Sequence, residues 1–377
     1  MRTRADLEKH EAESLAPYAL RSGDSLGRIE PEPPHRYRTA FQRDRDRVLH
    51  ARAFRRLQYK TQVFPYSEGD HFRNRLTHTL EVAQIARTVA RALAANEDLV
   101  EAIVLSHDLG HPPFGHAGEH VLNQLLKPQG GFEHNRQSLR IVDWLEDRSE
   151  RYPGLNLCHE TRAGILKHGS EFPRYAHPVP LPDLGAGPSV EAQIADVCDS
   201  IAYHTHDLDD GLRADILEWD ALGELGLFER ARAAANVREG RDARPRLTVA
   251  LIDLLATDLI EASARNLEQH RPVSPGAAAA LPERAIGFSP DIASEKRQLA
   301  RFLLDRFYRH PRVLRLAAEA DRILSDLWRH YASDPRQLPP HVLERAAGEP
   351  EERAIADYVA GMTDRFAIDE HRRLSQA

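Results

Sequence analysis

Cysteine is scarce in this sequence, whose 377 residues include only Cys158 and Cys198. Two cysteines cannot build the disulfide framework of a small secreted protein, and their scarcity fits a reducing compartment. The N-terminal residues also lack the apolar stretch of a signal peptide, so we expect a cytoplasmic location. No apolar run approaches the length of about 20 residues that a membrane helix needs, so we expect no membrane partner.

Positive charge is not in excess either. The formal net charge is -7, from 51 Lys and Arg against 58 Asp and Glu. This balance argues against a protein that coats nucleic acid by bulk electrostatic attraction, although a local basic cluster can still bind phosphates. Nucleic acid is therefore a partner that the composition allows but does not indicate. Hydrophobic residues make up 41% and charged residues 29%, which is typical of a soluble, folded protein.

Strand-rich sections, internal repeats and low-complexity tracts are also missing, whereas helical periodicity is widespread. It predicts helices over residues 76–93, 97–110, 189–212 and 247–262. Asn96 and Ser189 are N-cap candidates, while Gly110 and Gly211 are candidate ends. Further helices are expected over 295–331, as two that meet at Pro311, and over 351–374, as one last helix. The predicted fold class is all-α.

Stretches rich in proline, glycine and charge divide the chain. Residues 22–38 should be extended, and residues 171–188 and those after Pro272 should be connectors. We expect a partly flexible N-terminal extension at 1–38, a helical core at 39–272 and a C-terminal helical region packed on that core at 273–377.

One stretch, VLSHDLGHPPFGHAGEH at residues 104–120, is dense in histidine and acidic side chains. Its His107-Asp108 pair lies at the end of one predicted helix, while His78 and Asp199 lie inside two others. Imidazoles and carboxylates converging from separate elements suit a divalent metal that keeps positions open for water and substrate. A lone His or His-Asp pair often occurs by chance, but this ordered set is more specific. Asp196, one helical turn before Asp199, could also face the metal.

Other polar groups have a functional and a plain interpretation. His116 and Glu119 lie three residues apart at a predicted helix start, where one can orient the other. Asp199, Tyr203 and Asp207 share one helical stripe, which could line a pocket or hold a buried Tyr beside an exposed Asp. His120 is expected to be a surface residue.

Two segments rich in basic residues also have two possible interpretations each. FRRLQYKTQV, at residues 54–63, is either a solvated helix face or a wall for phosphate and sugar. FQRDRDR, at residues 41–47, alternates in charge and could serve an oligomer contact or a second nucleotide site.

The ordered His…His-Asp…Asp set resembles the HD-domain metallophosphohydrolase superfamily. Longer segments resemble the deoxynucleoside triphosphate (dNTP) triphosphohydrolases, the dGTPase-like family, in order over residues 36–373. They are FQRDRDRVLHARAFRRLQYKTQVF, NRLTHTLEV, SHDLGHPPFGHAGE, GFEHNRQS, DSIAYHTHDLDDGL, YRHPRV and DYVAGMTDRFA. Several long motifs in this order make chance similarity improbable.

This resemblance implies an HD-domain helical bundle with an additional C-terminal helical region. It implies hydrolysis of dNTPs, with dGTP among the substrates, at the α-phosphorus to deoxynucleoside and tripolyphosphate. By the resemblance, the metal ligands are His78, His107, Asp108 and Asp199. Mn²⁺ or Mg²⁺ is the expected ion, and Co²⁺, Fe²⁺, Ni²⁺ or Zn²⁺ would also suit these donors.

The resemblance also implies the remaining site residues. The catalytic group comprises His116, Glu119, His134 and His111, the last in contact with phosphate. Arg75 is expected near the α-phosphate, and Gln62, Tyr203 and Asp207 at the sugar. Arg56 and Lys60 would extend the phosphate wall, because a triphosphate of about four negative charges needs several cations.

Family members are often homo-oligomers, some activated by a dNTP at a second site, so a tetramer or hexamer with such a site is expected. The residues do not reveal the preferred base. Two other functions remain open: another HD-superfamily nucleotide phosphohydrolase, and a non-catalytic nucleotide sensor. The complete ligand set and the His116–Glu119 pair favour a catalyst.

Overall fold

The computed structural model describes residues 1–64, 72–166, 177–183, 185–236 and 243–376. Over these ranges the chain forms helices and loops, and its β-type pairing is limited to three isolated bridges. The all-α fold class is confirmed. Within the same ranges, no helix is both long and apolar enough to cross a membrane. The predicted connector at 171–188 falls partly outside the described residues.

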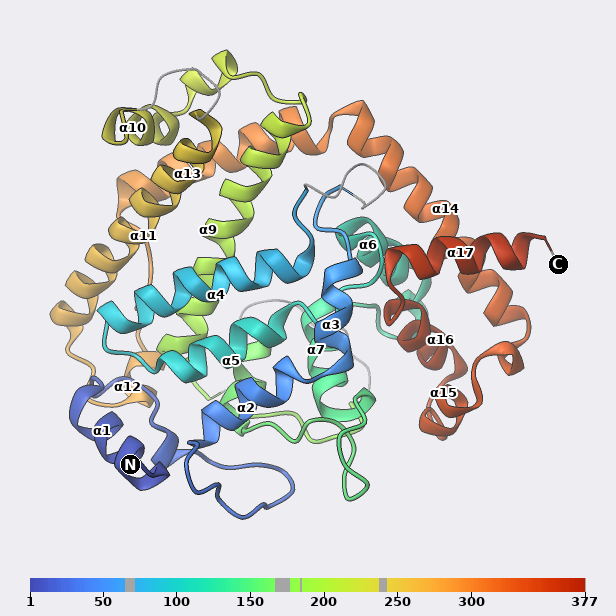
Figure 1. Ribbon diagram of the computed structural model, residues 1–377, viewed down its shortest axis with the longest axis horizontal. Helices are drawn as coiled ribbons and strands as arrows, with labels where there is room; N and C mark the ends of the chain where they lie inside the picture. Colours follow the sequence, from blue (N-terminus) through green and yellow to red (C-terminus); the bar gives the residue numbers. More distant parts are fainter. Residues whose placement is uncertain (65–71, 167–176, 184, 237–242, 377) are drawn as a thin grey trace.

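The α-helices, which Figure 1 labels except for α8, follow in chain order. They are α1 Arg4–Ser14, α2 Ala40–Leu49, α3 Arg52–Arg56, α4 Arg75–Ala92, α5 Glu97–His107, α6 Gly115–Leu125, α7 His134–Arg140, α8 His159–Ile165, α9 Val190–Arg213, α10 Gly226–Ala234, α11 Ala243–His270, α12 Pro275–Ala279, α13 Pro290–Leu303, α14 Pro311–Ser333, α15 Pro340–Arg345, α16 Glu351–Ala360 and α17 Asp364–Ser375. Two π-helical turns, Ile141–Leu145 and Leu304–Tyr308, extend α7 and α13.

Side-chain caps set the starts of the helices that carry the site. Asn74 accepts a hydrogen bond from the Thr77 amide at 2.9 Å and begins α4. Asn96 and Ser189 cap α5 and α9 as the sequence predicted. Each cap satisfies a main-chain N–H that the first helical turn would leave unpaired.

The two glycines predicted to end helices have another use. Helix α5 ends at His107, before Gly110, and α9 continues through Gly211. A Cβ on Gly110 would lie 2.2 Å from the His134 carbonyl oxygen, and one on Gly211 would lie 2.6 Å from a Leu217 methyl carbon. These glycines therefore allow close packing of neighbouring segments rather than a helix end.

The main core forms where α4 packs on α5 and α9, with α2 outside α5 and α11 outside α9 (Figure 1). Helix α11 contains the predicted segment 247–262 and buries a stripe of Leu247, Leu251, Leu255 and Leu259. Burying each leucine contributes roughly 1.5–3 kcal/mol. Three elements of this core, α4, α5 and α9, carry the predicted metal ligands.

A second apolar cluster joins α6 to the C-terminal helices α14, α16 and α17. The prediction of one last helix over 351–374 was wrong, because the chain breaks between α16 and α17. Thr363 caps α17 by accepting from the Phe366 amide at 3.3 Å. The break places the buried Asp364 carboxylate against the amides of Thr61, at 2.8 Å, and Phe114, at 2.9 Å.

The N-terminal extension is anchored to the core. Arg28 forms an ion pair with Asp44 and donates to the Asn156 carbonyl at 2.6 Å. Arg47 donates to the same carbonyl at 2.7 Å, and Arg45 pairs with Asp98 at 2.9 Å. Several charges of segment 41–47 thus serve intramolecular contacts.

Glu191, fully buried at the start of α9, makes stability depend on pH. Its Oε1 accepts from the amides of Leu20 at 3.0 Å and Asn96 at 3.2 Å. Burial raises the pKa of Glu191 to about 7, against about 4.3 in an unfolded chain. The folded state therefore holds this proton more tightly, and stability falls as pH rises from about 4.3 to 7.

We expect Glu191→Gln, which keeps the acceptor oxygen, to raise the free energy of unfolding by about 1–3 kcal/mol at pH 8. At pH 4.5 the variant and the native chain should differ little, since Glu191 is then protonated in the folded state. Urea denaturation at both pH values measures this, and an equal difference at both would contradict the assignment.

Candidate metal centre and active site

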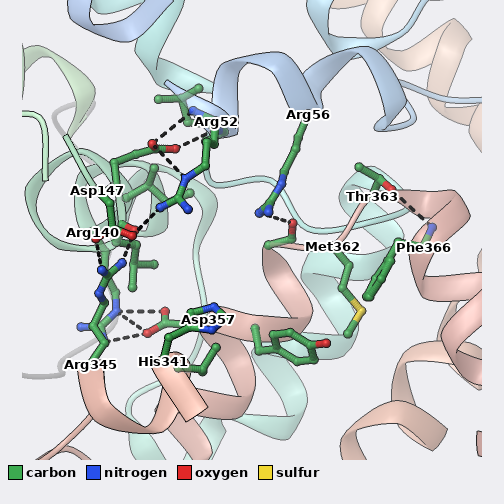
Figure 2. Close-up of a pocket in the computed structure, with 18 of the residues that line it drawn as sticks. Arg52, Arg56, Arg140, Asp147, His341, Arg345, Asp357, Met362, Thr363 and Phe366 are labelled. Atoms are coloured by element: carbon green, nitrogen blue, oxygen red, sulfur yellow. Dashed lines mark hydrogen bonds and ion pairs between the residues drawn. The ribbon is translucent and has the colours of Figure 1, made fainter. Parts of the chain in front are cut away.

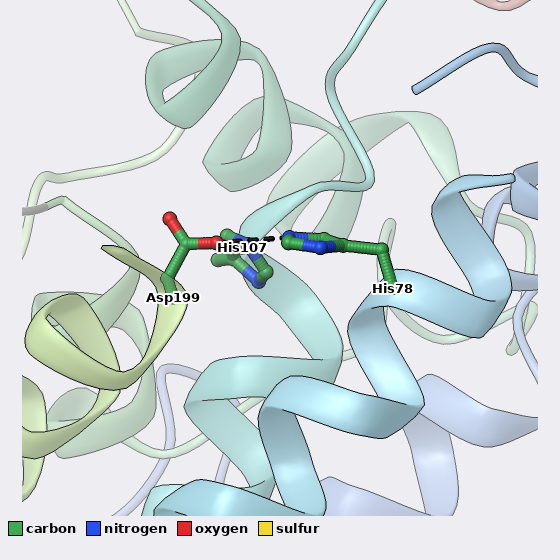
Figure 3. Close-up of side chains that lie close together, drawn as sticks. All are labelled: His78, His107 and Asp199. Atoms are coloured by element: carbon green, nitrogen blue, oxygen red, sulfur yellow. Dashed lines mark hydrogen bonds and ion pairs between the residues drawn. The ribbon is translucent and has the colours of Figure 1, made fainter. Parts of the chain in front are cut away.

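Three of the predicted ligands meet where α4, α5 and α9 converge (Figure 3). The Asp199 Oδ1 atom lies 3.0 Å from His78 Nε2 and 3.4 Å from His107 Nε2. Both histidines are buried, while Asp199 is partly exposed. The three side chains therefore point at one small space that can be reached from one side.

Neighbouring groups orient the two imidazoles. His107 Nδ1 donates to the Val104 carbonyl at 2.6 Å, because a carbonyl only accepts, so the lone pair lies on Nε2. His78 Nδ1 lies 3.4 Å from His206 Nδ1, and His206 Nε2 lies 3.3 Å from Glu81. Such outer contacts hold a histidine in the tautomer that can ligate a metal.

Asp108 adjoins this group from the residue after α5. One carboxylate oxygen lies 3.2 Å from His107 Nε2, and the other accepts from Arg75 at 2.9 Å. Burial alone would raise the pKa of Asp108, but the neighbouring His107 ring and the Arg75 charge hold it well below its usual range. His78, His107 and Asp199 form one compact group of donors, whereas Asp108 belongs to a neighbouring group with His111 and His134. Two imidazoles and a carboxylate, with a second carboxylate beside them, suit a divalent cation.

The rival residue Asp196 lies elsewhere on α9. Its carboxylate forms an ion pair with Arg284. It belongs to none of the clusters of His and acidic groups that could hold a metal among the described residues. The geometry therefore favours Asp199 over Asp196 as the fourth ligand.

A second cluster begins beyond the Pro112-Pro113 break, where α6 carries His116 and Glu119. Glu119 accepts from His134 Nδ1 at 2.8 Å, and its other oxygen lies 3.4 Å from His116 Nδ1. Burial would raise the pKa of Glu119, but the hydrogen bonds from His116 and His134 hold it well below its usual range. One carboxylate thus orients two imidazoles.

His111 links the two clusters. Its ring stacks on His134 with centroids 4.0 Å apart, and its Nε2 lies 3.3 Å from Asp108. Burial and the nearby Arg75 charge lower the pKa of His111 well below its usual value, which keeps the ring neutral. The predicted metal and catalytic groups therefore form one continuous polar surface.

Tyrosines form the adjacent wall of the site. The Tyr203 ring lies 6.1 Å from His116 and stacks on Tyr308 with centroids 6.0 Å apart. The Tyr308 hydroxyl donates to the buried Asp207 carboxylate. Burial raises the pKa of Asp207 to about 8. Of the predicted stripe Asp199–Tyr203–Asp207, Tyr203 lies beside His116, whereas Asp207 is fully buried beneath Tyr308.

Gln62 and Arg75 carry buried polar atoms that lack hydrogen-bond partners among the described residues. These atoms are Gln62 Oε1 and the Nε and Nη2 of Arg75. Gly115, at φ +60°, allows the main chain to run close to these atoms, since a Cβ there would lie 3.0 Å from Arg75 Nη2. Buried polar atoms are rarely left unpaired, so these suit a ligand.

Arg56 and Lys60, expected along the phosphate wall, are directed elsewhere. Arg56 donates to the Gly361 carbonyl at 2.9 Å. The buried Lys60 ammonium donates to the carbonyls of His111 and Ala360. Lys60 thus uses its ammonium on two main-chain acceptors and ties the end of α16 to the His111 segment.

The sequence left three neighbouring residues without a role: Tyr308, His206 and Asp364. Tyr308 and Asp364 lie in the C-terminal motifs YRHPRV and DYVAGMTDRFA, which could have pointed to them. Their partners are far away along the chain, so only the packing of distant helices shows what they touch. His206 is placed beside His78 by α9 alone, three residues after Tyr203.

Gly110 offers a test of how closely the segment that follows α5 packs against α7, which begins at His134. A Cβ there would lie 2.2 Å from the His134 carbonyl and 2.3 Å from the Ser138 amide nitrogen. We expect Gly110→Ala to destabilise the fold by at least about 3 kcal/mol, because main-chain atoms cannot give way as a side chain can. Gly276→Ala in α12 is the control, since a Cβ there meets nothing within 4 Å. Equal thermal midpoints for both variants would contradict the close packing of α7.

Comparison with known proteins agrees with this geometry. The HD domain matches residues 75–204, and a phosphohydrolase-associated domain matches residues 286–373. The HD match contains His78, His107, Asp108 and Asp199.

Relatives resemble the chain over nearly its whole length. A protein of Ralstonia pickettii is 49% identical, over 96% of this chain and 94% of the relative. A protein of Ralstonia nicotianae is 50% identical over 98% of this chain and 95% of the relative. A protein of Geobacter metallireducens is 45% identical over 97% of this chain and 96% of the relative. Each is named deoxyguanosinetriphosphate triphosphohydrolase-like protein. The resemblance seen in the sequence is confirmed, and the chain belongs to the family of deoxyguanosinetriphosphate triphosphohydrolase-like proteins.

Proposed function

We propose that this protein is a metal-dependent dNTP triphosphohydrolase, with dGTP among its substrates. Water would attack the α-phosphorus, the bond to the 5′-oxygen would break, and tripolyphosphate and a deoxynucleoside would leave. The observation that carries this proposal is the contact of His111 with both Asp108 and His134. This contact joins the residues that suit a metal ion to the imidazoles that Glu119 orients. Water attack on a phosphate ester needs both a cation and a group that transfers protons.

The cation would be held by His78, His107, Asp108 and Asp199, whose orientation supports this role. When bound, a divalent ion, Mn²⁺ or Mg²⁺ by preference and Co²⁺, Fe²⁺, Ni²⁺ or Zn²⁺ as alternatives, would polarise phosphoryl oxygens and activate water.

His116 is the group we assign to proton transfer. Its side chain is 55% exposed, the most open of the cluster, and its Nδ1 faces Glu119. A carboxylate on Nδ1 fixes the tautomer of the ring and leaves the Nε2 lone pair to face the substrate. His116 Nε2 would accept a proton from the attacking water and then donate it to the leaving 5′-oxygen. His134 shares Glu119 and supports the arrangement.

The remaining polar groups would bind the substrate. The unpaired guanidinium nitrogens of Arg75 suit the α-phosphate, and Gln62 Oε1 suits a sugar hydroxyl. Tyr203, backed by Tyr308, would lie flat under the deoxyribose and leave little room for a 2′-hydroxyl. Asp207, beneath Tyr308, would read the 3′-hydroxyl by a hydrogen bond.

A substrate panel of dNTPs and ribonucleotides, with added Mn²⁺, Mg²⁺ or Co²⁺, tests this function. Metal-dependent release of tripolyphosphate from dNTPs would support it. Orthophosphate or pyrophosphate as product would instead indicate another HD-type nucleotide phosphohydrolase. No turnover with any of the metals would indicate a non-catalytic nucleotide sensor.

On the family resemblance alone, we also propose a cytoplasmic homo-oligomer, a tetramer or hexamer, that a second dNTP can activate. Light scattering of the purified protein with and without dNTP measures the subunit number. A monomer under both conditions would contradict the assembly.

A further inference from the structure

The basic residues expected along the phosphate wall do not all bring their charge to the metal group. Arg56 lines a separate cavity between α3 and the C-terminal helices α15, α16 and α17, where it donates to the Gly361 carbonyl at 2.9 Å (Figure 2). The Lys60 ammonium is taken by two main-chain carbonyls. Of these three expected cations, only Arg75 contacts a proposed metal ligand, Asp108. A triphosphate of about four negative charges needs further cations.

Helix α13 brings another cation, Lys296, to this group. The Lys296 ammonium donates to the hydroxyl of Ser200, which directly follows the proposed ligand Asp199 on α9. Burial lowers the pKa of Lys296 to about 8, and the nearby carboxylates of Asp196 and Asp199 oppose this change. Most of the ammonium is therefore protonated at neutral pH. Asp199 and Ser200 are both partly exposed, so Lys296 reaches the part of α9 that stays open beside the metal group.

Lys296 keeps hydrogen-bond donors for a ligand. An ammonium has three donors, and Ser200 takes one of them. The other close neighbour is the Phe288 ring, whose centroid lies 5.5 Å from the ammonium and whose face attracts the charge without an acceptor atom. Over the ranges that the structure describes, Lys296 forms no ion pair, whereas Arg284 is paired with Asp196. Two donors are thus left for phosphate oxygens.

The segment that contains Lys296 also reaches the proposed sugar site. Helix α13 packs against α9 and continues through a π-helical turn to Tyr308, which stacks on Tyr203 (Figure 1). Lys296, earlier in this segment, contacts Ser200 instead. A nucleotide with its sugar on Tyr203 and its α-phosphate at Asp199 would therefore have its outer phosphates within reach of Lys296.

We propose that Lys296 binds the β- and γ-phosphates of the substrate and thereby selects triphosphates over monophosphates. This role rests on the proposed function, in which the α-phosphate lies at Arg75 and the metal group. Lys296 would act in binding and not in proton transfer, because it faces the part of the substrate that leaves intact as tripolyphosphate.

Calorimetric titration of the full chain in EDTA measures this binding without metal or turnover. We expect dGTP to bind the native protein at least tenfold more tightly than dGMP. Lys296→Gln should weaken dGTP binding at least tenfold and leave dGMP binding within twofold, because dGMP ends at the α-phosphate. Arg297→Gln is the matched control, since Arg297 follows directly on α13 and is exposed. This control should bind both nucleotides within twofold of the native protein.

Lys296→Arg separates the charge of the side chain from its packing. Arginine keeps a positive charge and several donors, so this variant should bind dGTP within about threefold of the native protein. Equal losses for dGTP and dGMP in Lys296→Gln, with a lowered thermal midpoint, would indicate a structural role and overturn the proposal. Unchanged dGTP binding in that variant would overturn it too, as would native protein that binds dGTP no more tightly than dGMP. If Lys296→Gln does not fold, Lys296→Met, which keeps the apolar stem beside Phe288, gives the same readouts.

Steady-state rates with added Mn²⁺ connect Lys296 to the proposed function. Lys296→Gln should raise KM for dGTP at least tenfold and lower kcat by less than about threefold, because it removes binding that substrate and transition state share. Hydrolysis of dGTP with an unchanged KM would overturn the role of Lys296 and leave the proposed function standing. Binding of dGTP through Lys296 without hydrolysis in any metal would support the role of Lys296 and remove the proposed function.

Discussion

Replacing Asp199 by Ala should remove the bound divalent metal and lower dNTP turnover by about 10³-fold or more, since the ion contributes several kcal/mol. Asp199 Oδ1 faces both His78 and His107. The other carboxylate of the proposed ligand set, Asp108, contacts His107 and already shares its charge with Arg75. Metal content by mass spectrometry and initial rates with dGTP measure the two effects together.

Asp196→Ala is the matched control, one turn away on the same helix. Its carboxylate pairs with Arg284, so metal content and rate should stay close to those of the native protein. If Asp199→Ala retained the metal and Asp196→Ala lost it, Asp196 and not Asp199 would be the ligand.

His116→Ala should keep the metal and lose about 10²–10⁴-fold in kcat, the usual contribution of one general acid or base. His116 lies outside the metal group and contacts Glu119. Metal content and kcat, with circular dichroism as the check on folding, separate loss of proton transfer from loss of the fold.

His120→Ala is the matched control for His116. It follows Glu119 directly, is exposed, and bonds only to Gln124, at 2.7 Å, among the described residues. We expect its kcat to stay within about twofold of the native value. A near-normal kcat in His116→Ala would remove His116 from the mechanism and direct attention to His134.

Local signals were enough to predict much of the fold and to bring together the residues of the candidate metal centre. Asn96 and Ser189 cap helices where predicted, because capping depends on a few adjacent residues. The ligand group could be anticipated because His78, His107-Asp108 and Asp199 stand on three strongly periodic helices. Their convergence needed no unusual loop geometry, only the packing of α4, α5 and α9.

Long-range contacts account for what the sequence did not reveal. Lys60 looked like a phosphate contact, but its ammonium is taken by carbonyls from two distant segments. Gly211 looked like a helix end, but it admits Leu217 and Phe307. The last predicted helix is broken so that Asp364 can reach Thr61. In each case a residue outside the element itself decides the outcome, and periodicity carries no information about it.

Hydrolysis of dGTP in ¹⁸O-labelled water, with both products weighed by mass spectrometry, tests the central claim most directly. Water attack at the α-phosphorus predicts one ¹⁸O in tripolyphosphate, none in deoxyguanosine, and equal amounts of the two. Label in deoxyguanosine would contradict attack at phosphorus. Formation of dGMP with pyrophosphate, or of dGDP with orthophosphate, would contradict the proposed function itself.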